Sequence, residues 1–438
     1  MTVPTTPFQA VRDLGQRLNG NDGDYDRLLS MARDRRFVLL GEATHGTQEF
    51  YRMRAAISRR LITEEGFDAV AIEGDWPDAW RTNRFVQGSG DDDAESALDD
   101  FERFPAWMWR NREFLGFVDW LRSRNFSVEA IRRAGIFGLD LYSLYRSADA
   151  VIRYLDHIDP EKATQARRYY EVLDHVREPQ TYGYQAAFGL RPSGRDAALE
   201  QLLKLRARAE AYVSSNGLDA RDAYFFAERN AAVVVNAEAY YRAMFGRRVN
   251  TWNLRDAHML DTLLALSHYL QERGGSGRVV VWAHNSHLGD ARATEAHHRG
   301  EWNLGQLLRQ QVGHEALLVG FTTYTGHVSA ASQWDADVEH KWVRPALADS
   351  IEHLFHRSGL DRFFLPLNEE AAAPLRESLL ERAIGVIYLP ETERVSHYFD
   401  ASVANQFDAV FHIDESSALE PLDKPHHWHR PEASETAT

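Results

Sequence analysis

Short apolar runs rich in Val, Ile, Leu and Phe recur along the whole chain, with longer segments of helical period between them. The runs span 36–42 (RFVLLGE), 68–75 (DAVAIEGD), 134–140 (AGIFGLD), 278–283 (RVVVWA), 315–322 (EALLVGFT), 383–389 (AIGVIYL) and 407–414 (FDAVFHID). Apolar runs of this length, bounded by polar residues or glycine, predict strands that are buried on both faces. Strands that alternate with helices predict an α/β fold, with a mostly parallel or mixed central sheet and helices on both faces.

The segment 144–272 contains no convincing strand and predicts a large helical insertion. This insertion either caps the active-site cleft or covers one face of the sheet. We therefore expect a single catalytic domain over 1–418 and a mobile tail, rich in Pro, Glu and His, over 419–438. The acidic segment 87–100 (QGSGDDDAESALDD) predicts an exposed loop.

Composition excludes several classes of function. The 438 residues include no cysteine, which rules out thiol catalysis, thiolate zinc sites and disulfides. The net charge is −15, and no basic stripe offsets it, so nucleic acid is not an expected partner. Neither a secretory signal nor an apolar run long enough to span a bilayer is recognisable, so we expect no membrane partner and a cytoplasmic protein.

Ionisable side chains follow several of the predicted strands. Glu42 and His45 follow the first strand, Glu73 closes the second, and His284 and His287 follow the strand at 278–283. Ligands of open α/β sheets bind at the carboxyl ends of strands, so we expect these side chains to meet at one rim. Gly41 and Gly46 bracket the first pair, as expected for a tight turn with close backbone approach.

Weaker candidates for substrate binding lie near the same strand ends: Asp75, Trp76, Asp140 and Arg255. Each has a purely structural alternative. An aspartate after a strand is often the cap of the next helix. A buried tryptophan is more often core than cleft. For Arg255, an ion pair at a helix start is the preferred explanation, and for Glu73 the structural alternative is an ion pair with Arg54.

Several catalytic motifs are absent. The chain has no G-x-S-x-G elbow, which disfavours a serine hydrolase of the α/β-hydrolase type. It also lacks a phosphate-binding P-loop, a strand-linked G-x-G-x-x-G and an H-E-x-x-H zinc motif. No cofactor is therefore expected from motifs, and the expected partner is a small-molecule substrate.

The segments GEATHG, EFYRMR, AIEGDWPDA and WAHNSHLGDARAT together resemble the erythromycin esterase family, over about 34–418. The resemblance implies a fold of the EreA and ChaN-like type, and hydrolysis of a macrolide lactone by activated water without a covalent intermediate. It makes His45 similar to the family's general base and Glu42 to the carboxylate beside it. In the same way, Glu73, Arg54, His284 and His287 match the family's remaining acidic, arginine and paired histidine positions.

Elementary chemistry agrees with a histidine base. Histidine has an unperturbed pKa close to neutrality, and a carboxylate bonded to the imidazole fixes its tautomer. We expect His45 to take the proton from water, with Glu42 or Glu73 orienting it and with Arg54, His284 and His287 placing the water or stabilising the oxyanion.

Two alternatives remain open. In the first, Glu42, His45, Glu73, His284 and His287 bind a divalent metal that acidifies water. In the second, the chain is a non-catalytic small-molecule binding protein on the same fold.

Overall fold

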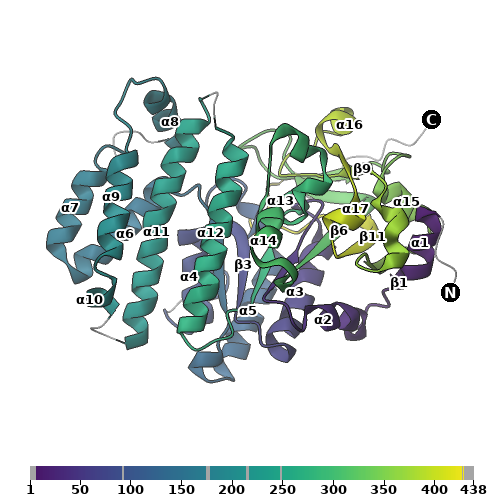
Figure 1. The fold of residues 1–438 in the computed structure, drawn as a ribbon, viewed down its shortest axis with the longest axis horizontal. Helices are drawn as coiled ribbons and strands as arrows, with labels where there is room; N and C mark the ends of the chain where they lie inside the picture. The colour runs from purple at the N-terminus through teal and green to yellow at the C-terminus, as the bar shows by residue number, and fades with distance from the viewer. Residues whose placement is uncertain are drawn as a thin grey trace. The chain divides into compact units, whose positions relative to one another are not determined.

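The structure is a computed structural model that describes residues 6–90, 93–173, 178–213, 217–246, 249–426 and 428 (Figure 1). The chain divides into two compact units. Unit 1 comprises Met1–Val70, Phe85–Gly135 and Arg278–Thr438, and unit 2 comprises Ala71–Arg84 and Ile136–Gly277. Each unit is described by itself.

Unit 1 contains a mixed sheet. Its strands lie in the order β1 (Gln16–Arg17), β8 (Arg362–Pro366), β11 (Ala409–Ser416), β6 (Ala316–Ala330), β2 (Phe37–Leu40) and β5 (Val279–Trp282). β2 runs parallel to both β5 and β6, and β11 runs parallel to β6. β8 and β7 (Glu339–Val343) are antiparallel to their neighbours. The short strands β9 (Leu379–Arg382) and β10 (Tyr398–Ala401) form a separate antiparallel pair.

Unit 1 also contains helices, several of which contact strands of this sheet. They are α1 (Pro7–Leu14), α2 (Asp26–Ala32), α3 (Gln48–Glu64), α5 (Arg112–Phe126), α13 (Asn285–Leu288), α14 (Leu304–Val312), α15 (Ile351–Arg357), α16 (Glu393–Ser396) and α17 (Val403–Gln406). All four residues of β2 and of β5 are buried, as expected for central parallel strands. Trp282 packs between Phe114 and Phe117 of α5, with ring centroids 6.0 and 5.0 Å away.

Unit 2 is mainly helical. It contains the end of β3 (Ala69–Asp75), most of α4 (Trp76–Val86) and β4 (Gly135–Asp140). Seven helices follow: α6 (Leu144–Ile158), α7 (Pro160–Tyr170), α8 (Pro179–Ala187), α9 (Arg195–Arg206), α10 (Ala209–Val213), α11 (Gly217–Ala243) and α12 (Thr251–Glu272). α11 contacts α6, α8, α9, α10 and α12, and Figure 1 shows it between α9 and α12. Its run of buried Ala and Val, 231–234, explains this central position.

The apolar runs at 36–42, 68–75, 134–140, 278–283, 315–322 and 407–414 each contain a strand, as predicted. The described part of 144–272 contains helices and no strand, also as predicted. The expectation of a strand at 383–389 is wrong. This segment forms only isolated bridges, from Ile384 to Thr44 and from Ile387 to Ala331. Without joining the sheet, Ile384 and Tyr388 are buried against Val328 and Ala330 of β6 and Val343 of β7.

Two segments expected to be loose are anchored in their described parts. In the acidic segment, of which 91–92 lie outside the described residues, Ala97 and Leu98 are fully buried. In the expected tail, the backbone N–H of Leu419 donates to the Gly46 carbonyl at 2.8 Å, and the Trp428 ring stacks on His340. Residues 427 and 429–438 lie outside the described part.

None of the described helices combines the length and the apolar character that crossing a bilayer requires.

Gly46 marks a close approach that the fold requires. A Cβ at this position would lie 1.8 Å from the Ser329 carbonyl oxygen, so β6 and the loop after β2 would have to separate. We expect Gly46→Ala to lower the free energy of unfolding by about 1–3 kcal/mol or more, as measured by urea denaturation. Gly116→Ala is the matched control, because a Cβ there meets nothing within 4 Å on helix α5. Equal stability of the two variants would contradict the close approach.

Candidate active site

The loop that follows β2 is held by backbone hydrogen bonds on several sides. Gly41 N–H donates to Val319 O at 2.8 Å, Ile384 N–H donates to Ala43 O at 2.7 Å, and His45 N–H donates to Ile384 O at 3.3 Å. Ile384, in the segment 383–389, therefore holds the loop through backbone hydrogen bonds to Ala43 and His45. The loop carries Glu42 and His45, so their side chains start from a fixed backbone.

Glu42 connects His45 to Arg54. Its Oε1 lies 2.9 Å from His45 Nδ1, and its Oε2 lies 2.7 Å from Arg54 Nη2. The Arg54 side chain is 0% exposed, that of Glu42 1% and that of His45 8%. Because a carboxylate only accepts hydrogen bonds, Nδ1 of His45 carries the proton, and Nε2 is left as the basic nitrogen.

Arg54 is compensated by one carboxylate and by aromatic rings. Its guanidinium carbon lies 4.3 Å from the Tyr51 ring centroid and 5.1 Å from that of Trp282. Its Nε and Nη1 have no hydrogen-bond partner among the described residues. Glu42 is therefore the only carboxylate paired with this buried cation in the described part of the chain.

His284 follows the neighbouring strand β5 and begins α13. Its Nδ1 accepts the Ser286 backbone N–H at 3.2 Å and lies 2.8 Å from Ser286 Oγ. A nitrogen that accepts an N–H carries no proton, so the neutral ring bears its proton on Nε2. The His284 and His45 ring centroids are 4.8 Å apart. The two imidazoles are therefore neighbours with opposite assignments: His45 offers a basic Nε2, and His284 an Nε2–H donor.

Asn285 and His287 complete this turn. The Asn285 backbone N–H donates to Glu42 O at 2.8 Å, and its side-chain amide exchanges hydrogen bonds with the Phe321 backbone. Asn285 and His287 are 0% and 2% exposed. The turn after β5 and the loop after β2 are thus joined directly through main-chain atoms.

A second charged cluster lies in unit 2. Arg255 Nη2 is 2.7 Å from Glu73 Oε1 and 2.6 Å from Asp140 Oδ2, and Arg255 Nε donates to Asp140 Oδ1 at 2.9 Å. Burial lowers the pKa of Arg255, but Asp140, Tyr142 and Glu73 more than offset this, and the pKa stays well above its ordinary value. Glu73 therefore pairs with Arg255, whereas Arg54 pairs with Glu42.

The remaining two candidates of unit 2 have structural partners. Asp75 Oδ1 accepts the Tyr142 backbone N–H at 2.9 Å. Trp76 is 1% exposed, stacks on Phe137 and donates its indole N–H to Phe226 O at 3.2 Å. These contacts are those of residues that hold the unit together, and substrate binding by either residue stays a prediction.

The candidate metal ligands have other contacts. Among the described residues, no group of three or more His, Asp or Glu side chains is placed to hold a metal ion. Glu42 uses its two oxygens for Arg54 and His45, and His284 uses Nδ1 for Ser286. The described arrangement thus suits an imidazole base and does not gather ligands around a metal.

Sequence reasoning missed the parts of the site that are bound through the backbone. Asn285 lies between the two histidines in the sequence, where nothing indicates its hydrogen bonds to the backbone of Glu42 and Phe321. Ile384 read as a strand residue, although it braces the His45 loop. The apolar run around Ile384 was a signal for burial, but nothing local indicated its partner.

The Glu42–Arg54 pair gives a stability test. Arg54→Met or Glu42→Gln leaves a buried charge without its partner, so we expect each to lower the free energy of unfolding by about 3–5 kcal/mol. The double variant should lose at least 1 kcal/mol less than the sum of the two, because neither charge remains. Urea denaturation measures all three. The exposed pair Arg27–Glu369 is the control, and Glu369→Gln should change stability by about 1 kcal/mol or less. Additive losses at Glu42 and Arg54 would contradict the coupling.

Comparisons with known proteins identify the family and the fold of the chain. The family model of erythromycin esterase matches residues 62–416. The match begins after Glu42, His45 and Arg54, so the roles of those three rest on their geometry. Erythromycin esterase type II of Escherichia coli is 22% identical over 427 residues, which cover 92% of this chain and 96% of that protein.

Solved structures show the same fold. A succinoglycan biosynthesis protein is 20% identical with a TM-score of 0.73, over 94% of this chain and 97% of the other. A mutant of the erythromycin esterase EreC in its open conformation is 16% identical with a TM-score of 0.66, over 92% and 96% of the two chains. The fold is thus the α/β fold of these structures, and with the family model matching most of its length, the chain belongs to the erythromycin esterase family.

Proposed function

We propose that this protein is a carboxylic ester hydrolase that opens a lactone or ester with a water molecule activated by His45. The observation that carries the proposal is the buried chain from Arg54 through Glu42 to His45 Nδ1. Such a chain has the form of a general base with its orienting carboxylate. Family membership supports hydrolysis as the class of reaction.

In the proposed reaction, His45 Nε2 accepts a proton from water as the water oxygen attacks the ester carbonyl carbon. The carbonyl π electrons move to oxygen and give a tetrahedral oxyanion. This intermediate collapses, the bond to the alkoxide leaving group breaks, and the imidazolium returns the proton to that oxygen. The products are a carboxylic acid and an alcohol, and no covalent bond to the protein forms. Glu42 stabilises the imidazolium while it exists.

His284 is the proposed donor to the oxyanion. Its proton lies on Nε2, because Nδ1 accepts from Ser286. Its ring adjoins the His45 ring, so a carbonyl near the His45 base is within reach of this N–H. We assign the orienting role to Glu42 and not to Glu73, since Glu42 contacts the imidazole and Glu73 contacts Arg255.

His45→Gln should reduce kcat for an accepted ester by two to four orders of magnitude, on the order expected for loss of a general base, with the fold intact by circular dichroism. Glu42→Gln should also reduce kcat strongly, because the neutral amide stabilises the imidazolium less. Glu73→Gln is the matched control and should spare kcat more than Glu42→Gln does. Near-wild-type kcat for His45→Gln would refute the assignment.

The substrate is proposed to be a macrolide-type lactone, by analogy with the esterases named above. Incubation with a panel of macrolides should yield products heavier by one water, about 18 Da, detected by mass spectrometry. Activity should survive a chelator. Loss of activity with chelator and recovery with a divalent ion would favour the metal-dependent alternative. A ligand that binds and is recovered unchanged would indicate a binding protein instead.

A further inference from the structure

Glu381 is a buried acid that the proposed reaction does not use. It lies on β9, its residue is 1% exposed, and neither carboxyl oxygen makes a hydrogen bond of ordinary geometry among the described residues. An ionised carboxylate in such a place would lose its hydration without compensation. The burial therefore favours the neutral acid.

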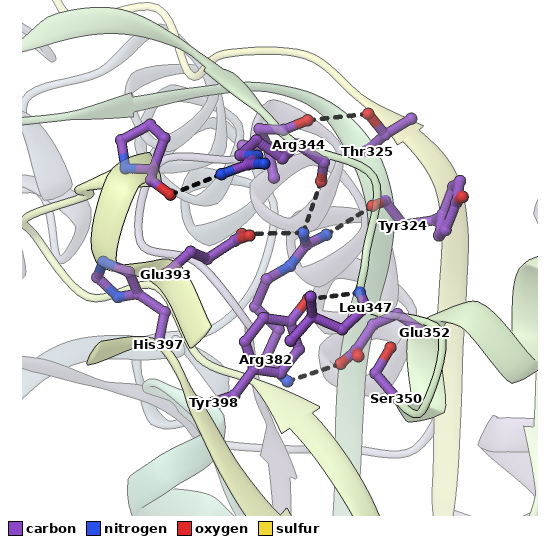
Figure 2. Close-up of polar contacts among 12 residues, drawn as sticks. Tyr324, Thr325, Arg344, Leu347, Ser350, Glu352, Arg382, Glu393, His397 and Tyr398 are labelled. Atoms are coloured by element: carbon purple, nitrogen blue, oxygen red, sulfur yellow. Dashed lines mark hydrogen bonds and ion pairs between the residues drawn. The ribbon is translucent and has the colours of Figure 1, made fainter. Parts of the chain in front are cut away.

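The neighbouring arginine does not neutralise it. Successive side chains of a strand point to opposite faces, so Arg382 turns away from Glu381. Figure 2 shows the Arg382 guanidinium among the carbonyls of Tyr324 and Arg344 and the Glu393 carboxylate, at 2.8, 2.8 and 3.2 Å. These acceptors satisfy the cation on its own side of the strand.

The groups that face Glu381 come from three other elements. The side-chain amides of Asn285 on α13 and Gln406 on α17 adjoin its carboxyl group, and the buried Glu352 on α15 is the charged neighbour. Glu352 Oε1 accepts the Arg382 backbone N–H at 2.9 Å, as Figure 2 shows. No cation of the described chain faces Glu381 directly, and the one titratable neighbour carries the same sign of charge.

Two of these contacts lead directly to the active site. Asn285 stands next to His284, and its backbone N–H binds the Glu42 carbonyl oxygen. The Gln406 carbonyl oxygen accepts the Asp290 N–H at 3.0 Å, at the far end of the same turn. A change at Glu381 therefore acts on both ends of the segment that carries His284 and His287.

We propose that Glu381 is a positioning residue of the ester-hydrolysing site, which as an uncharged carboxylic acid supports the His284–His287 turn through Asn285 and Gln406. Ionisation of Glu381 places an uncompensated charge under this turn and lowers activity. The positioning role rests on the proposed esterase function, whereas the uncharged state does not.

The direction of the pH effect follows from linkage. Burial, with Glu352 adding to it, raises the pKa of Glu381 from 4.5 to about 8. The folded state therefore holds a proton that the unfolded chain releases above about pH 4.5, and stability falls as pH rises from there through 8. Glu381→Gln keeps the shape of the neutral acid and removes this loss.

Thermal unfolding from pH 5 to 9 tests the uncharged state without any substrate. The melting temperature of Glu381→Gln should rise relative to wild type as pH increases toward 9. Glu377→Gln is the control, since this acid is exposed just before the same strand, and its difference from wild type should not change with pH. If Glu381→Gln folds poorly, the apolar Glu381→Met replaces it in the same comparison. A difference from wild type that is constant over this pH range would overturn the proposal.

The pH profile of kcat/KM on a chromogenic ester, p-nitrophenyl butyrate, tests the positioning role. Wild type should lose activity with an apparent pKa near 8, and Glu381→Gln should keep its activity there. Glu381→Met, which removes the carboxyl group that adjoins both amides, should lower kcat and leave KM unchanged. An alkaline limb that persists in Glu381→Gln would overturn the role. Absence of turnover in the wild-type protein would contradict the proposed esterase function. The thermal unfolding experiment would then still show whether the Glu381 carboxyl group is protonated.

Discussion

The buried contact between Arg54 and Glu42 is the interaction on which the site of unit 1 depends. Both side chains are almost completely buried, so neither charge is stable there without the other. Glu42 follows β2, and Arg54 lies in the second turn of α3. The ion pair therefore holds α3 against the loop that follows β2. The other carboxylate oxygen of Glu42 is available to bind His45 Nδ1. The proposed base is therefore oriented by a carboxylate that the buried ion pair holds in place.

The central strands and their chemistry were predictable because parallel strands buried on both faces appear as continuous apolar runs. The run 36–42 contains β2, and 278–283 contains β5. Since β2 and β5 are parallel neighbours, the residues after them meet at one edge. The adjacency of the His45 and His284 rings follows from that pairing, and each signal was local in the sequence.

What the sequence did not reveal depends on distant partners. The sequence allows Arg54 as an ion-pair partner of Glu73, whereas in the structure Arg54, on helix α3, pairs with Glu42. The apolar run around Ile384 indicated burial correctly, yet its backbone braces the His45 loop and joins no sheet. Glu381, in a short Leu-Leu-Glu-Arg strand, has no local mark of burial. Strand β8 was missed because its five residues, RFFLP, end in a proline that is atypical of strands.

The account's central claim is that Glu42 fixes the tautomer of His45, so that Nε2 is the base. Long-range ¹H–¹⁵N spectra of the histidine-labelled protein at neutral pH test it most directly, with His45→Gln used to assign the signals. The account predicts that His45 carries its proton on Nδ1 in wild type and loses this preference in Glu42→Gln. A proton on Nε2 of His45 in the wild-type protein would contradict it.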